Sequence, residues 1–301
     1  MILILSANKD FTTNEVIKWL HIFDKKYIRV HEFELFEIKV IDQKILLKSQ
    51  RNSFYIDDIT SVWFRRGGIK FNRLQFQNDS VNEIMNETQF WLEDYVIKKL
   101  ESKRHINKQS NNRTNKLLIL EKAVAAGLNV PSYFLADTTD NINLGKTITK
   151  SISENIIVKS AFDDFDGILY TSIIDKHEDE VFFPTFFQEK VEKEFEIRCF
   201  YLNGKVWSCA IFSQNDEQTK IDNRIYNYGK PNRNVRYTLP PEIHDKICIL
   251  MTDLDYNCGS IDFIKSIDGK FYFLEVNPVG QFLGISDMCN YTLEKEIADY
   301  L

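Results

Sequence analysis

The sequence lacks any apolar run long enough to cross a membrane as a helix. Such a helix needs about 20 consecutive apolar residues, and no stretch of this 301-residue chain approaches that length. The apolar segment Met1–Leu5 carries no basic residue and is followed by no small-residue cleavage site. It therefore predicts a buried first strand rather than a signal peptide, and we expect no association with a membrane.

Cysteine is scarce, and its spacing fits neither disulfides nor a metal site. The five cysteines are an odd number, and no two of them form a C-x-x-C pair. This argues against a disulfide framework and a zinc knuckle, and it favours a reducing, cytoplasmic setting. We expect the cysteines to serve as small buried hydrophobic residues.

An excess of positive charge and a glycine-rich nucleotide motif are also missing. The chain has 38 basic and 44 acidic residues, a net charge of −6, which argues against a general nucleic-acid binder. There is no G-x-G-x-x-G motif, so no dinucleotide site is predicted. Neither internal repeats nor low-complexity segments occur. With 44% hydrophobic residues, the composition is typical of a globular protein.

The first third of the chain is typical of a small α/β unit. The apolar run Ile2–Leu5 predicts a strand. The capping-box spacing of Thr12–Glu15, followed by an apolar helical pattern, predicts the start of a helix. Further extended segments are expected at residues 28–33, 45–47 and 61–64. This alternation of strands and a helix indicates an α/β arrangement.

The rest of the chain divides at a polar stretch. A helix is predicted from Val81 to about Leu100, and the polar stretch Glu101–Arg113 after it indicates a linker and a domain boundary. Another helix is predicted from Asn115 to Gly127, with the glycine at its C′ position. A short strand is expected at Ile156–Lys159, and the chain is rich in strands from Glu194 onward.

A predicted hairpin near the C-terminal end brings two carboxylates together. Asp268-Gly269, between two β-rich runs, predicts a two-residue turn. Counting outward from that turn pairs Phe263 with Leu274, Asp262 with Glu275, and Ser260 with Asn277. Opposed side chains in an antiparallel pair lie about 5 Å apart at Cβ, so the two acids would repel each other. Oxygen ligands of this kind suit Mg²⁺, and the hairpin therefore predicts a metal site formed by Asp262, Glu275 and Asn277.

The alternative for this hairpin is a pair of exposed carboxylates on a solvated face. Apolar neighbours such as Ile264, Phe273 and Val276 argue against it. A one-residue error in the turn would place the two acids on opposite faces and remove the prediction.

A second hairpin and two lysines complete a possible nucleotide site. Asn203-Gly204 predicts a two-residue type I′ turn between two strands, which places Glu196 and Arg198 on one face. The pair is either a surface ion pair or a set of ribose and phosphate contacts. Lys116 begins a helix, where anions are favoured. Lys159 ends an apolar strand, where an unpaired ammonium is costly.

These segments, in this order, resemble the ATP-grasp family over about residues 115–285. Asn115-Lys116 and Ala126–Pro131 resemble the segment that opens the central domain. Ile157–Lys159 resembles the strand that carries the adenine-side lysine. The hinge that hydrogen-bonds adenine is matched by Gln188, Glu189, Lys190 and Val191. The ribose and phosphate contacts are matched by Glu196 and Arg198. The metal signature is matched by Asp262, Glu275, Asn277 and Gly280-Gln281.

Other segments are similar to one branch of that family, the grasp-with-spasm and microviridin-type (graspetide) peptide maturases. They are residues 61–66, residues 212–216 leading to 219–224, and residues 230–233 followed by 239–240. The resemblance implies an α/β (α+β) ATP-grasp fold with three parts. These are an N-terminal pre-ATP-grasp α/β domain with the linker (1–114), a central domain (115–190) and a C-terminal antiparallel-sheet domain with the metal site (191–301).

The resemblance also implies an activity. An Asp or Glu side chain of a ribosomal precursor peptide is activated by ATP as an acyl phosphate, and a Ser, Thr or Lys side chain then closes an ω-ester or ω-amide ring. One or two Mg²⁺ ions would assist. Lys116, Lys159 and Arg198 would offset phosphate charge. Arg65, Arg66 and Arg224 would hold the substrate carboxylate, and Asp222 would act as a base. The partners implied are the leader and core of the precursor and a second copy in a homodimer.

One segment departs from the family pattern. Many ATP-grasp enzymes have a glycine-rich loop after the second lysine, whereas Ser160–Gly167 has one glycine and three aspartates. We assign no catalytic role to that loop.

Two other functions remain open from the sequence. One is an ATP-grasp amino-acid or glutamate ligase that acts on a small amine. The other is a nucleotide-gated peptide-binding protein without turnover, which should lack one of the three metal ligands. A plain α/β scaffold would leave the two opposed acids unexplained.

Overall fold

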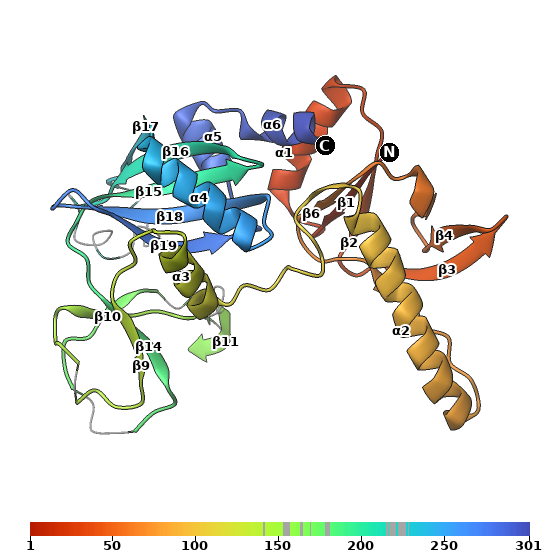
Figure 1. Cartoon of the computed structure of the whole chain (residues 1–301), viewed down its shortest axis with the longest axis horizontal. Helices are drawn as coiled ribbons and strands as arrows, with labels where there is room; N and C mark the ends of the chain where they lie inside the picture. The colour runs from red at the N-terminus through yellow and green to blue at the C-terminus, as the bar shows by residue number, and fades with distance from the viewer. Residues whose placement is uncertain are drawn as a thin grey trace.

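The chain is described here by a computed structural model that covers residues 1–140, 142–152, 157–162, 165–168, 170–177, 181–214, 216, 221, 227 and 229–301. Figure 1 shows a large antiparallel sheet with helices on both faces, a smaller sheet below it and an N-terminal α/β unit beside it. None of the described helices is long and apolar enough to cross a membrane.

The N-terminal unit is the α/β unit that the sequence predicts, and its first sheet is parallel. Its strand order is β2-β1-β6-β8, and every residue of the first strand is buried. The strands are β1 (Ile2–Ser6), β2 (Tyr27–His31), β6 (Ser61–Phe64) and β8 (Arg104–Ile106). The helices of this unit are α1 (Phe11–Ile22) and α2 (Asp79–Glu101).

A second N-terminal sheet lies beside the first, in the order β5-β4-β3-β7. Its members are β3 (Leu35–Ile41), β4 (Lys44–Lys48), β5 (Ser53–Tyr55) and β7 (Lys70–Phe71), with the short 3₁₀ helix η1 (Ile56–Asp58) after β5. The pairing of β3 with β4 is antiparallel, and the pairing of β3 with β7 is parallel.

The start of α1 differs from the predicted capping box. Asp10 is the N-cap, and its carboxylate accepts from the backbone N–H groups of Thr12 and Thr13 at 3.0 and 3.4 Å. A carboxylate at this position satisfies two of the free N–H groups of the first turn. The helix therefore begins at Phe11, and Thr12 and Thr13 lie within its first turn.

The stretch 101–113 is not a solvated linker. Residues Arg104–Ile106 form β8, and the carboxylate of Glu101 accepts from both N–H and Oγ of Ser110 at 2.8 Å. The side-chain amide of Asn107 is buried and donates to the carbonyl oxygens of Cys258 and Pro278 at 3.1 and 2.8 Å. Polar side chains of this segment therefore hold it against the C-terminal strands. The polar composition of the segment does not by itself predict these contacts.

The middle of the chain contains α3 (Lys116–Ala125) and two small sheets. Asn115 is the N-cap of α3, and Gly127 follows the helix with a φ of +81°, as predicted for the C′ position. The four-stranded sheet has the order β13-β10-β14-β9. Its strands are β9 (Tyr133–Ala136), β10 (Thr147–Thr149), β13 (Ser172–Ile173) and β14 (Thr185–Glu189); β11 (Ile157–Phe162) pairs with β12 (Phe165–Ile168).

The C-terminal sheet is antiparallel, with the order β17-β16-β15-β18-β19. The strands are β15 (Lys193–Leu202), β16 (Lys205–Phe212), β17 (Arg233–Tyr237), β18 (Cys258–Ser266) and β19 (Phe271–Asn277). The helices are α4 (Pro241–Asp253), α5 (Leu283–Cys289) and α6 (Leu293–Tyr300).

Two cores cover the two faces of this sheet. On one face α3 and α4 bury side chains such as Leu120 and Ile247 against Ile197 and Phe263. On the other face α5 and α6 pack with α1 and β1 against residues such as Phe200. The second core joins the N-terminal unit to the C-terminal sheet, so the loops after β1 and β6 are fixed relative to β18 and β19.

Both predicted hairpins form, but their turns differ. Leu202 pairs with Lys205, and both Asn203 and Gly204 have positive φ, which confirms the two-residue loop. The other turn is longer than predicted, because Ser266 N–H donates to the carbonyl oxygen of Lys270 at 2.9 Å and leaves three residues in the loop.

The longer turn shifts the pairing near the tip by one residue, so Phe263 pairs with Phe273 and not with Leu274. An irregularity next to Asp262 shifts the register back. Asp262 therefore pairs with Glu275, and Ser260 pairs with Asn277, as the sequence predicts. The two deviations cancel where the predicted metal site lies.

Candidate active site

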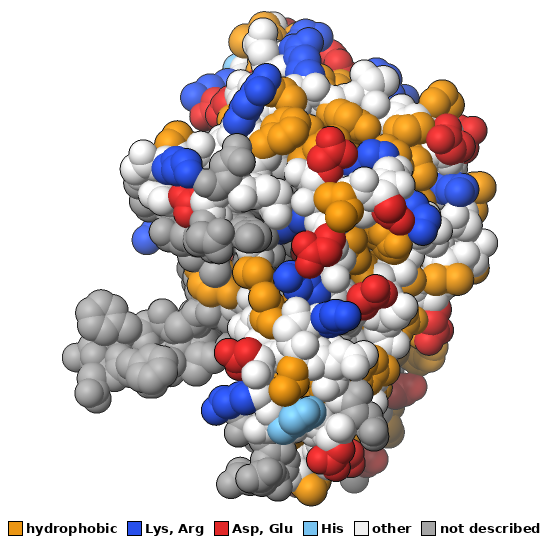
Figure 2. All heavy atoms as spheres, turned by 90° about the vertical axis from the view of Figure 1, so that its left-hand side faces the viewer, with side chains coloured by type: hydrophobic (Ala, Val, Ile, Leu, Met, Phe, Trp, Pro, Cys, Tyr) orange, Lys and Arg blue, Asp and Glu red, His pale blue; other side chains and the backbone are white. Residues whose placement is uncertain are grey.

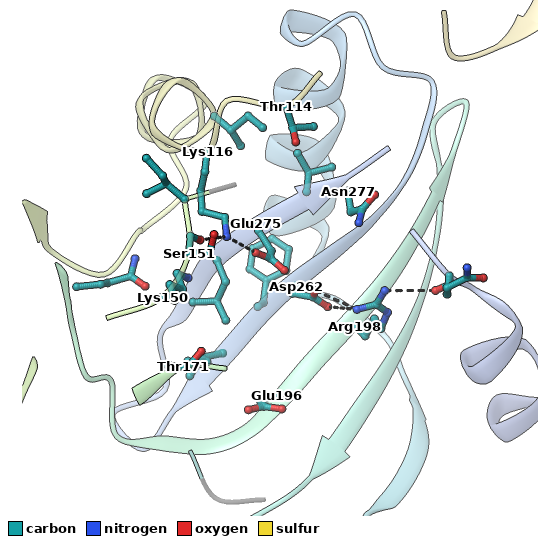
Figure 3. Close-up of a pocket in the computed structure, with 18 of the residues that line it drawn as sticks. Thr114, Lys116, Lys150, Ser151, Thr171, Glu196, Arg198, Asp262, Glu275 and Asn277 are labelled. Atoms are coloured by element: carbon teal, nitrogen blue, oxygen red, sulfur yellow. Dashed lines mark hydrogen bonds and ion pairs between the residues drawn. The ribbon is translucent and has the colours of Figure 1, made fainter. Parts of the chain in front are cut away.

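A cavity of about 920 Å³ lies between the central sheet, α3 and the C-terminal sheet. Its walls come from β10, β14, β15, β18 and β19, and one end reaches the loop after β6 at Arg66 and Gly67. Figure 3 shows the side chains that converge on it. Since the cavity is bordered by elements that are distant in sequence, the fold has to form before the site exists.

A row of charged residues crosses three strands on one wall of the cavity. Glu275 on β19 pairs with Asp262 on β18, and Asp262 pairs with Arg198 on β15. Paired residues point to the same face of a sheet, so all three side chains reach the cavity. The guanidinium of Arg198 lies 3.0 Å from Oδ2 and 3.2 Å from Oδ1 of Asp262, and it also donates to the carbonyl oxygen of Gln281 at 3.3 Å (Figure 3).

The second carboxylate of the row is held by a lysine. Lys116, the first residue of α3, has its Nζ 3.0 Å from Oε2 of Glu275, and it donates to the carbonyl oxygen of Ser151 at 2.9 Å (Figure 3). Each of the two opposed acids therefore has a cation beside it. The repulsion expected between the acids is offset by Lys116 on one side and by Arg198 on the other.

Asn277 lies on the same face of β19, two residues beyond Glu275. Its Oδ1 accepts from the N–H of Val279 at 3.0 Å, which holds the turn that follows β19. Gly280 in that turn is packed so closely that an added Cβ would lie 2.4 Å from the side chain of Ser260. The turn therefore requires glycine there, and it fixes the amide of Asn277 beside the row of acids.

The residues present fit a hard divalent cation. Two carboxylates and one amide oxygen come from adjacent strands, and such oxygen donors are those that Mg²⁺ prefers. The amide oxygen has a second lone pair besides the one used by Val279. Asp262, Glu275 and Asn277 are the residues that would hold the ion.

The cavity is also lined by a buried side-chain amide, for which the described part of the chain supplies no hydrogen-bond partner. Gln188 on β14 is fully buried, and among the residues that the structure describes neither its Nε2 nor its Oε1 has a hydrogen-bond partner. It lines the cavity near Pro131 and Ile148. An unmade hydrogen bond at a buried polar group costs about 1–3 kcal/mol, so a ligand that both donates and accepts at this point would be strongly favoured.

The backbone around Gln188 is already engaged. The N–H of Glu189 donates to the carbonyl oxygen of Ser132, and the N–H of Lys190 donates to that of Lys146, both at 2.8 Å. Two N–H groups of the predicted hinge are therefore engaged within the protein, whereas the side chain of Gln188 offers both a donor and an acceptor to the cavity. Glu189, Lys190 and Val191 also line the cavity.

Glu196 also lines the cavity, but its partner is not Arg198. The ammonium of Lys193 donates to the carboxylate of Glu196 and to the carbonyl oxygen of Ile221 at 3.2 Å. Lys193 was not predicted as a site residue, because strict alternation puts it on the face opposite Glu196. An irregularity between Lys193 and Phe195 brings both charged residues to the same face.

Arg65 and Arg66 have different surroundings. Arg65 is buried, and its guanidinium donates to Asp10 at 3.0 Å, to the carbonyl oxygens of Val279 and Gly280, and to Oε1 of Gln281. Burial lowers the pKa of Arg65, and Asp10 counteracts this effect. The side chain of Arg66 is 44% exposed, lies 3.9 Å from the same carboxylate and borders the cavity. Arg66 is therefore the better placed of the two to bind a substrate.

No motif predicts some of the cavity residues, and some of the predicted residues lie outside the described part of the chain. Thr114, Lys150, Ser151 and Thr171 line the cavity (Figure 3), and Lys150 lies over the ring of Phe186 at 6.0 Å. No motif marks these four. Thr114 lies just before α3, and the other three lie next to the ends of β10 and β13. The predicted Asp222 and Arg224, the side chain of Lys159 and those of the loop 160–167 lie outside the described part of the chain.

No protein-family model and no curated protein matches this sequence. Solved structures do match, over the whole chain. The RiPP-associated ATP-grasp ligase of Chryseobacterium gregarium, solved with ADP and a leader and core peptide, is 22% identical, with a TM-score of 0.79 over 100% of this chain and 96% of that one. The chain has the ATP-grasp fold.

Two further structures have the same fold. The macrocyclase MdnC of Microcystis aeruginosa MRC, bound with the precursor peptide MdnA, is 22% identical, with a TM-score of 0.76 over 100% of this chain and 99% of that one. The ATP-grasp ligase PsnB, complexed with a minimal precursor, Mg and ADP, is 15% identical, with a TM-score of 0.63 over 99% and 95%. The predicted ATP-grasp fold is thereby confirmed, including its α/β character. The row of acids and cations described above lies within that fold.

Proposed function

We propose that this protein is an ATP-dependent ligase that closes rings in a ribosomal precursor peptide. In this proposal an Asp or Glu side chain of the peptide is phosphorylated, and a Ser, Thr or Lys side chain displaces the phosphate to give an ω-ester or ω-amide. The observation that carries the proposal is the row Glu275–Asp262–Arg198, with Lys116 beside it, in the wall of a large cavity.

The nucleotide would lie along that cavity. Gln188 presents a donor and an acceptor together, which matches the paired acceptor and amino group on the edge of adenine. Glu196 would accept from the ribose hydroxyls. Lys116 and Arg198, with Lys159, would offset the charge of the phosphates. The similar structures from C. gregarium and of PsnB were solved with ADP, which supports a nucleotide in this position.

Asp262, Glu275 and Asn277 would hold one or two Mg²⁺ ions. When bound, Mg²⁺ neutralises phosphate charge and so favours phosphoryl transfer. The chain itself would position the reacting groups. With Mg²⁺ beside them, Asp262 and Glu275 would no longer need Arg198 and Lys116 to balance their charge. Both basic side chains would then be able to turn toward the phosphates. PsnB was solved with Mg as well as ADP, in support of this pairing.

The peptide carboxylate would enter from the end of the cavity at the loop after β6. Arg66 borders that end and is partly exposed. We therefore propose that Arg66 attracts the carboxylate of the peptide, and that Arg65 holds the adjacent turn in place. Arg224 and Asp222 keep their proposed roles, in binding that carboxylate and as a base for the incoming nucleophile. The MdnC and C. gregarium structures contain precursor peptides, which supports a peptide as the substrate.

Three properties of the whole chain belong to the same proposal. We propose that the protein forms a homodimer and works in the cytoplasm, where its five free cysteines would stay reduced. The domain limits 1–114, 115–190 and 191–301 are part of the proposal too, and the change from α3 and its sheets to the long strand β15 near residue 191 supports the last of them.

The test is the mass of a precursor peptide after incubation with the enzyme, ATP and Mg²⁺. Each ring closed removes one water, a loss of about 18 Da, and releases one ADP. A gain in mass would instead indicate ligation of a small amine or amino acid. Tight binding of the peptide without ADP release would indicate a binding protein, and either result would refute the ring-closing proposal.

A further inference from the structure

Gln281 follows the turn after β19, where the N-terminal unit meets the wall of the cavity. The residue is exposed and lines the cavity. Its backbone carbonyl oxygen accepts from the guanidinium of Arg198 and from Oγ of Ser260, both at 3.3 Å. The main chain of Gln281 is therefore held beside the row of charged residues in the wall of the cavity.

The side chain of Gln281 is held by the N-terminal unit. Its Oε1 accepts from Oγ1 of Thr12 in α1 at 2.6 Å and from the guanidinium of Arg65 at 3.1 Å. Arg65 is buried and paired with Asp10, so it cannot move away without leaving a buried charge unpaired. Two hydrogen bonds to one oxygen therefore restrain the amide of Gln281 in both position and rotation.

These contacts also distinguish the oxygen of the amide from its nitrogen. A guanidinium has donors and no acceptor, so the amide atom next to Arg65 is the oxygen. Nε2 of Gln281 is the atom that does not contact Arg65, and it donates to none of the described residues. Its two N–H groups are therefore the part of this side chain that a ligand in the cavity can use.

We propose that Nε2 of Gln281 donates to the side-chain carboxylate of the peptide during both steps of ring closure. The inference rests on the proposed function, because it concerns the same cavity and the same reaction. Arg66 borders the cavity as well and would attract the carboxylate. Gln281 would then hold the carboxylate in the orientation in which it reacts.

One oxygen of the carboxylate takes part in the phosphoryl transfer, and the other would stay with Gln281. In the first step one oxygen attacks the γ-phosphorus of ATP, and the bond from that phosphorus to ADP breaks. The second oxygen becomes the carbonyl oxygen of the acyl phosphate. When the hydroxyl or amino group adds to the carbonyl carbon, this second oxygen takes up the negative charge. The carbonyl re-forms as phosphate leaves, and the proton of the nucleophile passes to the base. A donor on the second oxygen stabilises the charge where it develops.

A neutral donor suits this position. Arg198 and Lys116 would bind the phosphates in the proposed function, and a further cation would be drawn to the same phosphates. The amide of Gln281 has no charge, and its contacts with Thr12 and Arg65 keep it in place when Arg198 turns.

The surface of the protein does little to attract an acidic side chain. The chain has a net charge of −6. On the side of the molecule in Figure 2, acidic, basic and apolar side chains are interspersed among the described residues. Charge on that side does not by itself favour a carboxylate, so its recognition would depend on donors in the cavity.

The test is ring closure by Gln281→Glu with the precursor peptide, ATP and Mg²⁺, measured as the loss of water from the peptide. Glutamate keeps an oxygen for Thr12 and Arg65, but it replaces both N–H groups with an acceptor. The kcat should fall at least about 100-fold, as for the loss of other donors to a developing oxyanion. The KM for the peptide should change little, because the amide contacts one carboxylate of a long chain.

Gln281→Met separates the loss of the donor from the effect of the added charge. Methionine has a similar length and no N–H group, so kcat should fall at least about tenfold. The matched control is Thr12→Val, which removes the other hydrogen bond to Oε1 and leaves the donor in place. It should close rings within about threefold of wild type, because Arg65 still holds the amide. ADP affinity, measured by calorimetry, should differ by less than about fivefold among all of these proteins.

Two results would overturn this inference alone. Ring closure by Gln281→Glu at the rate of wild type would mean that Gln281 serves only as an acceptor for Arg65 and Thr12. An equal loss of kcat in Thr12→Val and Gln281→Met would assign the effect to the contact with α1. If wild type itself neither removed water from the peptide nor released ADP, the proposed function would fall, and this inference with it.

Discussion

Two arginine–aspartate pairs in this protein have the same length and different surroundings. In both, a guanidinium nitrogen lies 3.0 Å from a carboxylate oxygen. In the pair Arg65–Asp10 the side chains are 3% and 2% exposed, whereas in Arg198–Asp262 they are 29% and 25% exposed. Distance alone therefore does not distinguish a pair that holds the fold together from one that belongs to a reactive site.

Burial decides whether such a pair can exchange its partners. Arg65 also donates to two carbonyl oxygens and to Gln281, so separating it from Asp10 would leave a charge without solvent. Arg198 and Asp262 border the cavity and are reached by water. Separating them costs little when each gains another partner, as a nucleotide and a metal ion would provide. The buried pair fixes the turn after Asn277, and the exposed pair can open beside it.

The largest effect is expected at the exposed pair and on turnover. Asp262→Ala should lower ADP release with precursor peptide by at least about 1000-fold, because the metal loses a ligand and the phosphates lose neutralisation. Its free energy of unfolding should change by less than about 1 kcal/mol. Glu296→Ala, which removes a surface carboxylate paired with Lys205, is the control for activity. Undiminished turnover in Asp262→Ala would remove the metal assignment.

The next effect is expected at the buried pair and on stability. Arg65→Met leaves the carboxylate of Asp10 buried without its partner, and it should lower the free energy of unfolding by about 3–5 kcal/mol. Urea denaturation measures this loss. The control is Lys205→Met, which removes the surface ion pair with Glu296 and should cost about 0–1 kcal/mol. Adding Asp10→Asn, which keeps the helix cap, should recover part of the loss. Equal effects of Arg65→Met and Lys205→Met would mean that burial does not separate the two classes of pair.

The pairing of Asp262 with Glu275 is as predicted, although the turn from which it was counted is longer than predicted. The dipeptide Asp268-Gly269 marks a turn but does not specify its length, since two- and three-residue loops both place glycine at a positive φ. The register shift that cancels the error lies next to Phe273, whose N–H donates to the carbonyl oxygen of Asn129 at 2.8 Å. That contact comes from the loop after α3, about 140 residues away, and it accompanies the register shift in β19. No local pattern contains it.

The remaining differences have the same origin. Helix α3 and its glycine end depend on neighbouring residues, and they are as predicted. Lys193 reaches the site through a strand irregularity, and Gln188 is buried between β10 and β9 with no hydrogen-bond partner for its side chain among the described residues. Asp10 serves both as a helix cap and as the partner of Arg65. The sequence alone does not specify long-range contacts of this kind.

The smallest effect is expected in the coupling between Mg²⁺ and the nucleotide. Without metal, the phosphates of ADP must compete with Asp262 and Glu275 for Arg198 and Lys116, because those cations are already paired. Bound Mg²⁺ would occupy the acids and free the cations, so ADP should bind about tenfold more tightly with Mg²⁺ than without it, a coupling of roughly 1.4 kcal/mol. Calorimetric titration of ADP with and without Mg²⁺ measures this. In Asp262→Asn most of the gain should disappear, whereas in Asp10→Asn, which alters the buried pair, it should persist. If both variants lost the Mg²⁺-dependent increase in ADP affinity equally, the metal would act through the fold as a whole. The release of Arg198 from Asp262 would then not explain the coupling.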